Sequence, residues 1–167
     1  MKIPVFVSCP TALNPPQEAS KRLVLRELDR LGLEPRALGA SDYPNELPLK
    51  EVHVIAKHCS GGVILGFEQF RTKAGTWKQD TKQEKTINDL LRLPTPWNHL
   101  EAGVLFSLGL PLLVFKEDGI AGGIFDSGVT DVFVHTMPSS PASASQKKAL
   151  TGVFLKWQHL VRAHYYE

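Results

Sequence analysis

The residue of this sequence best suited to chemistry is Glu101, a single carboxylate in the stretch WNHLEAG of residues 97–103. The stretch predicts a helix that stops at Gly109, and an apolar strand is expected to follow at residues 112–115. In open α/β sheets, ligands bind beside the carboxyl ends of the strands. A carboxylate in the first turns of this helix would lie at that edge. A lone acid beside an aromatic residue and a glycine suggests chemistry on a small substrate that is cationic or contains a sugar.

The elements that must position Glu101 alternate along the chain. Short apolar runs predict strands at residues 3–8, 33–38, 61–66, 112–115 and 132–134. Apolar residues at helical spacing predict helices at residues 17–31, at 49–58, from 97 onward and at 146–164. This alternation predicts an α/β fold with helices on both faces of a mostly parallel, five-stranded sheet. Right-handed crossovers favour the flavodoxin-like strand order 2-1-3-4-5.

One domain is expected over residues 1–167, interrupted by a basic insertion at residues 68–95. The insertion contains little that could form a core, and we expect it to be partly helical near residues 87–93. Its basic residues could form a solvated face, or they could bind an anionic nucleotide or a partner. Those residues are Arg71, Lys73, Lys78, Lys82 and Lys85. A glycine-rich loop at residues 116–127 and a Ser/Pro/Ala linker at residues 138–145 complete the predicted connections.

Composition narrows the range of partners. The formal net charge is +2, so bulk charge does not indicate nucleic-acid binding. The two cysteines, Cys9 and Cys59, give no disulfide framework and fit a reducing, cytoplasmic compartment. We see no signal peptide and no apolar run of the length that spans a membrane. His53, His58 and Cys59 do not show a metal-ligand spacing, so no metal is expected.

Two short motifs resemble known families. The unit Glu101-x-Gly103, followed by Gly109-x-Pro111 before an apolar strand, resembles the nucleoside 2-deoxyribosyltransferase family. The run Trp97-x-x-x-Glu101 is similar to the Toll/interleukin-1 receptor (TIR) domain family, whose enzymatic members cleave NAD. Both families have the flavodoxin-like order, and both break the bond between a base and the anomeric carbon of a sugar. The resemblance therefore implies cleavage of an N-glycosidic bond with Glu101 as the catalytic residue.

Such cleavage passes through an oxocarbenium-like state, which a carboxylate stabilises or attacks. The nicotinamide of NAD is cationic and leaves neutral, so one glutamate is enough and no general acid is required. NAD would then be the substrate, and no cofactor is implied. The resemblance to small bacterial TIR proteins also implies antiphage defence and assembly into an oligomer or filament. Three alternatives remain open: a nucleoside or nucleotide deoxyribosyltransferase, an N-glycosidase acting on such substrates, and a non-catalytic nucleotide-binding or interaction module.

The expected substrate-binding residues surround Glu101. Backbone N–H groups near residues 8–11 could hold phosphate oxygens, and Trp97 or Phe67 could stack on a base. The full set is Ser8, Cys9, Pro10, Gly66, Phe67, Trp97 and Asn98.

Each of these residues also has a purely structural interpretation. Glu101 could simply complement the dipole of its helix, and Trp97 could belong to a core or an interface. Ser8 could satisfy its own loop, and Cys9 could be a small buried side chain. Asp42 and Tyr43 lie in a polar loop at residues 39–45, which could be a mobile lid or a plain turn before Pro44.

Overall fold

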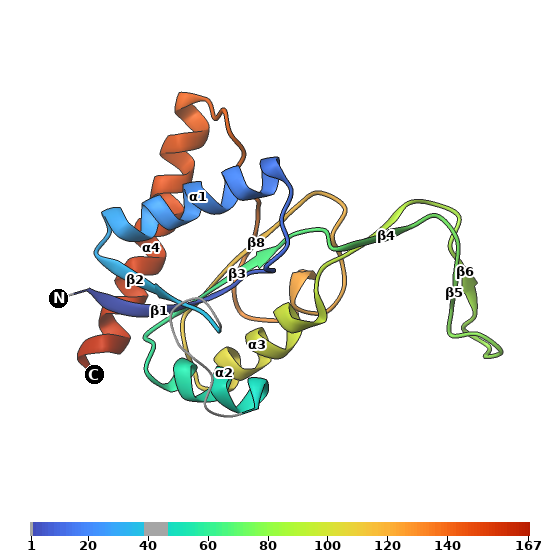
Figure 1. Cartoon of the computed structure of the whole chain (residues 1–167), viewed down its shortest axis with the longest axis horizontal. Helices are drawn as coiled ribbons and strands as arrows, with labels where there is room; N and C mark the ends of the chain where they lie inside the picture. Colours follow the sequence, from blue (N-terminus) through green and yellow to red (C-terminus); the bar gives the residue numbers. More distant parts are fainter. Residues whose placement is uncertain (1, 39–46) are drawn as a thin grey trace.

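A computed structural model describes residues 2–38 and 47–167 and has at its centre a sheet of five strands (Figure 1). The strands are β1 (Ile3–Ser8), β2 (Leu33–Arg36), β3 (Gly62–Gly66), β8 (Leu112–Lys116) and β9 (Val134–Thr136). They pair in the order β2-β1-β3-β8-β9, and each pairing is parallel. This is the flavodoxin-like order 2-1-3-4-5, so the predicted fold class is confirmed.

Helices cover both faces of this sheet (Figure 1). One face carries α1 (Pro15–Arg30) and α4 (Ala144–Tyr166), and the other carries α2 (Pro48–Lys57) and α3 (Pro96–Ser107). Val5 of β1 packs in the α1–α4 layer, whereas the adjacent Phe6 packs in the α2–α3 layer. Because both faces are covered, the central strands are continuous apolar runs.

Side-chain caps determine where α1 and α4 begin. Asn14 accepts a hydrogen bond from the backbone N–H of Gln17 (3.0 Å), and the Gln17 side chain accepts one from the backbone N–H of Asn14 (3.1 Å). Ser143 and Gln146 form the same reciprocal pair in front of α4. Such a capping box satisfies backbone donors that the first helical turn leaves free. Both helices therefore begin two residues earlier than the apolar spacing predicts.

Two strands differ from their predicted ranges by two residues, whereas β3 and β8 differ by one. The last strand covers Val134–Thr136 instead of residues 132–134, because its ladder with β8 begins where Val134 pairs with Val114. Phe133, which was expected inside the strand, is exposed. The second strand ends at Arg36 instead of residue 38, since its ladder with β1 stops at that residue.

The basic insertion is an antiparallel arm at residues 70–93, which projects away from the sheet (Figure 1). At its base, β4 (Phe70–Thr72) pairs with β7 (Leu91–Leu93), and further out β5 (Thr76–Trp77) pairs with β6 (Lys85–Thr86). The prediction of a helix near residues 87–93 is therefore wrong. Leu91 and Leu93 alternate with Arg92, which is the period of a strand.

Residues 117–133 connect β8 to β9. A 3₁₀ turn, η1 (Gly123–Phe125), lies within the glycine-rich loop that was predicted at residues 116–127. The loop with Asp42 and Tyr43 lies outside the described residues, so its role as a lid stays a prediction. Within residues 2–38 and 47–167, no helix combines the length and the apolar character needed to cross a membrane.

Candidate functional site

Three buried polar side chains meet at the carboxyl edge of the sheet. Ser8 ends β1, and Asn98 and Glu101 lie one turn apart on α3. Ser8 and Asn98 are fully buried, and Glu101 is 8% exposed. Buried polar groups are costly unless they are paired, so a cluster of three in one place needs an explanation.

The helix that carries this cluster begins at a fixed point. Thr95 caps α3, and its hydroxyl accepts a hydrogen bond from the backbone N–H of Trp97 (3.3 Å). Pro96 occupies the first turn, where its missing N–H is not needed. Side chains three residues apart lie on one face of a helix, so this start directs both Asn98 and Glu101 toward the end of β1.

A chain of hydrogen bonds links the three side chains. The Asn98 Nδ2 group donates to Ser8 Oγ over 2.8 Å. A serine hydroxyl has only one proton to donate, and this contact occupies its acceptor side. Hydrogen bonding by the Ser8 hydroxyl in turn favours the ionised form of the Glu101 carboxyl group and lowers its pKa. Asn98 thus orients Ser8 so that the Ser8 proton faces Glu101.

The carboxyl group of Glu101 is electrostatically unusual. Burial raises its pKa from the ordinary 4.5 to about 7, and the Ser8 hydrogen bond opposes that rise. Near neutral pH the group is therefore divided between its neutral and its ionised forms. Carboxyl groups tuned in this way occur at catalytic sites, although structural clusters can also shift a pKa.

Asn98 keeps one unused acceptor. Its Oδ1 atom is buried and has no hydrogen-bond partner among the residues that the structure describes. An unmade hydrogen bond to a buried polar atom costs about 1 to 3 kcal/mol. The atom can therefore accept a hydrogen bond from a bound molecule, such as one from a sugar hydroxyl, or from a water.

Cys9 follows Ser8 at the end of β1 and packs against the α1–α4 layer. Burial raises the pKa of its thiol to about 11; Lys21 lowers the pKa, while Glu18 and Glu101 add to the rise. The thiol is therefore protonated near neutral pH and is not a nucleophile. Its sulfur donates to the carbonyl oxygen of Pro10 over 3.5 Å, and Pro10 is itself buried. Neither residue offers a reactive group, and their contact with a substrate stays a prediction.

Trp97 lies one turn before Glu101 and is 39% exposed. Because it is neither fully buried nor fully open, part of its surface is accessible at the start of α3. That Trp97 stacks on a base stays a prediction.

Gly66 and Phe67 do not join the cluster. Phe67 is fully buried in the α1–α4 layer and presents no ring face for stacking. A side chain at Gly66 would overlap the ring of Phe125, so this glycine allows close packing at the end of β3. Burial thus excludes stacking of Phe67 on a base, whereas a substrate contact at Gly66 stays a prediction.

Glu117 and Gln17 also lie at the carboxyl edge of the sheet, and the sequence did not indicate them as candidate site residues. Glu117 follows β8, and its carboxylate accepts hydrogen bonds from the backbone N–H of Glu68 (2.6 Å) and from Gln17 Nε2 (3.1 Å). These contacts tie three chain segments together at the carboxyl edge. They join residues 49 and 100 positions apart, so no local pattern could have indicated them.

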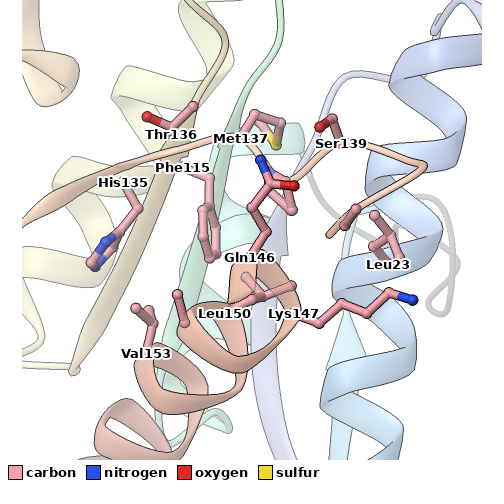
Figure 2. Close-up of a pocket in the computed structure, with 13 residues that line it drawn as sticks. Leu23, Phe115, His135, Thr136, Met137, Ser139, Gln146, Lys147, Leu150 and Val153 are labelled. Atoms are coloured by element: carbon pink, nitrogen blue, oxygen red, sulfur yellow. The ribbon is translucent and has the colours of Figure 1, made fainter. Parts of the chain in front are cut away.

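Two hollows of the surface lie apart from this cluster. Figure 2 shows one of about 310 Å³ between β9 and α4, with Phe115, Met137 and Leu150 among its lining residues and Gln146 reaching over it. The other, a groove of about 620 Å³, lies between α3, the arm and the loop after β8. His99 borders this groove; burial lowers its pKa, and its ring meets Phe125 edge-on at 5.6 Å.

Within the described ranges, no three His, Cys, Asp or Glu side chains cluster closely enough to hold a metal ion. Comparison of the chain with protein-family models found no match, and comparison with curated proteins found none either.

Proposed function

We propose that this protein cleaves an N-glycosidic bond, with NAD as the substrate and Glu101 as the catalytic residue. The observation that carries the proposal is the buried carboxyl group of Glu101, which Ser8 and Asn98 hold at the carboxyl edge of a parallel sheet. Ligands of open α/β folds bind at this edge. The Glu101 motif also resembles enzymes that act on the bond between a base and a sugar.

The proposed reaction requires only one catalytic group from the protein, the carboxylate of Glu101. The bond between the nicotinamide nitrogen and the anomeric carbon breaks, and nicotinamide leaves with the electron pair as a neutral molecule. The ionised Glu101 carboxylate stabilises the positive charge that develops on the ribosyl carbon, or attacks that carbon. Water then adds to the carbon and releases a proton, giving ADP-ribose. In a cyclising enzyme, a nitrogen of the adenine would add in place of water.

The neighbouring residues support this role. The Ser8 hydroxyl holds one side of the carboxylate, and the free Asn98 Oδ1 can accept a hydrogen bond from a ribose hydroxyl. Trp97 offers an aromatic surface for a base at the start of α3. Because the ionised form of Glu101 does the work, the rate should rise as the pH increases through about 7.

The test is product analysis of the purified protein with NAD and, in parallel, with a panel of nucleosides and nucleoside monophosphates. The wild type should release nicotinamide, and Glu101→Gln should release none while keeping its fold. Glu27→Gln is a matched control, because Glu27 lies on α1 and pairs with Arg30 on the exposed surface. The mass of the second product separates ADP-ribose from a cyclic product.

Other outcomes would redirect the proposal. Release of a base from a deoxynucleoside, with NAD untouched, would make the protein a deoxyribosyltransferase or a nucleotide N-glycosidase. Binding of a nucleotide without turnover, unchanged by Glu101→Gln, would make it a non-catalytic module. Either result contradicts NAD cleavage.

The biological setting follows from the resemblance alone. We propose a cytoplasmic enzyme of bacterial antiphage defence, which acts by depleting NAD or by producing a signalling nucleotide. The free cysteines Cys9 and Cys59 suit a reducing compartment. Survival of infected cells that express the wild type or Glu101→Gln would test this setting.

A further inference from the structure

The arm at residues 70–93 has no core of its own. None of its residues is buried, and most are exposed. Its base is held to the body by Arg92, which pairs with Glu68 (3.2 Å) and donates to the carbonyl oxygen of Asp118 (3.2 Å). The outer strands β5 and β6 extend well beyond this attachment (Figure 1). A two-stranded hairpin is marginally stable in water by itself, so the outer arm calls for a surface to pack on.

An apolar groove lies between the arm and the body. Its volume is about 620 Å³. Trp77 lines it from the arm, Ala102 and Phe106 line it from α3, and Val129 lines it from the loop after β8. Trp77 is 49% exposed and Phe106 is 51% exposed. Open apolar patches of this kind mark interaction sites, and exposed tryptophans often provide most of the binding energy.

The arm and the loop that border the groove are segments of opposite net charge. The arm at residues 70–93 contains six Lys or Arg residues and three Asp or Glu residues, which gives a net charge of +3. The loop at residues 117–131 contains four acidic residues and no basic one, which gives a net charge of −4. The basic segment and the acidic segment therefore belong to one chain, and each can complement the other across a two-fold axis.

We propose that two copies of this chain form a symmetric dimer in which each copy lays its arm across the groove of the other. Trp77 of the partner subunit is the apolar anchor, and it contacts Phe106 and Val129. The lysines of the outer arm face the acidic loop at residues 117–131. The acidic loop would repel the phosphates of a nucleic acid, which makes a second copy the better occupant. This interface does not depend on the proposed activity of Glu101.

The first experiment measures mass in solution by sedimentation equilibrium over a concentration series around 10 µM. The wild type should be a dimer, and Trp77→Ala should weaken dimerisation at least tenfold. Tyr166→Ala is the matched control, because Tyr166 is an exposed aromatic residue at the end of α4, away from the groove. A monomeric wild type throughout the series overturns the proposal. A dimer that Trp77→Ala leaves intact overturns the proposed surface.

The second experiment reverses charges. Lys82→Glu with Lys85→Glu should weaken the dimer, and so should Asp118→Lys with Asp131→Lys. All four residues are exposed, so the variants should fold, which circular dichroism can check. Combining the four substitutions should restore most of the affinity, because the arm and the loop again have opposite signs. Failure of the combined variant to recover overturns the pairing of arm with loop.

Discussion

The site around Glu101 and the outer arm break the usual distribution of side chains in opposite ways. Around Glu101, polar groups are buried, and one acceptor of Asn98 has no partner among the described residues. On the arm, Trp77 and Phe70 are exposed. Buried polar groups and exposed apolar patches are the two departures that carry information about function.

This difference indicates separate roles for the site around Glu101 and for the arm. Burial alters the chemistry of a group, because it raises the pKa of the Glu101 carboxyl group to about 7. Exposure of the apolar side chains of the arm shifts no pKa, but it keeps their surface available for a partner. We therefore expect changes in the site to affect activity and pH dependence, and changes in the arm to affect assembly.

The largest effect should come from moving the carboxylate without removing it. Glu101→Asp keeps the charge and withdraws it by one methylene group. Misplacement of a catalytic group by about 1 Å costs on the order of 100-fold in rate, so nicotinamide release should fall by about that factor. A rate within twofold of the wild type would show that the position of the carboxylate does not matter, and the comparison between site and arm would fail.

The next effect concerns stability. The folded-state pKa of Glu101, about 7, lies above the ordinary 4.5, so burial favours the protonated form. Stability from this group is fully present below pH 4.5 and is lost as the pH rises through 7. The shift corresponds to a loss of about 3 kcal/mol in the free energy of unfolding.

Glu101→Gln removes the buried charge and should abolish this loss. At pH 8 the variant should be more stable than the wild type by up to about 3 kcal/mol, and near pH 4.5 the two should differ less. Denaturant unfolding at both pH values measures the effect. Equal pH dependence of the two proteins would mean that the Glu101 pKa is ordinary.

A smaller effect separates the two neighbours of Glu101. Ser8→Ala removes a donor to the carboxylate and should raise the Glu101 pKa by about one unit. Asn98→Ala should shift it less, because the Ser8 hydroxyl can still donate. The midpoint of the pH–rate profile reports both shifts. A larger shift for Asn98→Ala would contradict the proposed order of the hydrogen bonds.

The smallest effect should appear in the arm. Trp77→Ala should change the free energy of unfolding of the monomer by no more than about 0.5 kcal/mol, because no arm residue is buried. Phe67→Leu, in the fully buried α1–α4 layer, should cost about 1 kcal/mol or more. Thermal unfolding under dilute conditions compares the two. A large loss for Trp77→Ala would make the arm part of the core and would remove the contrast with the site.

The fold was largely predictable because both faces of the sheet are covered. Apolar runs such as residues 61–66 indicate buried strands, and the spacing of Val24 and Leu28 indicates a helix packed on them. The insertion was predicted but its strands were not, since strands of two or three residues that bury nothing are too short for a reliable apolar pattern. Helix starts were missed by two residues where the caps Asn14 and Ser143 act through side-chain hydrogen bonds.

The site was predictable in part. Asn98 and Glu101 are three residues apart on a recognisable helix, and Ser8 ends a recognisable strand. The hydrogen bond between Ser8 and Asn98 spans 90 positions and depends on how α3 packs against β1. Phe67 was misassigned because strand ends alternate between two faces, and its face turns toward the α1–α4 core.

The most direct test of a site built around a tuned carboxyl group is a carbon-13 NMR titration of the glutamate side chains. The signal that Glu101→Gln removes identifies Glu101. This signal should titrate with a midpoint near 7, raised by burial from the ordinary 4.5. A midpoint near the ordinary value would show that Glu101 behaves as a solvated acid, and it would contradict the account of the site.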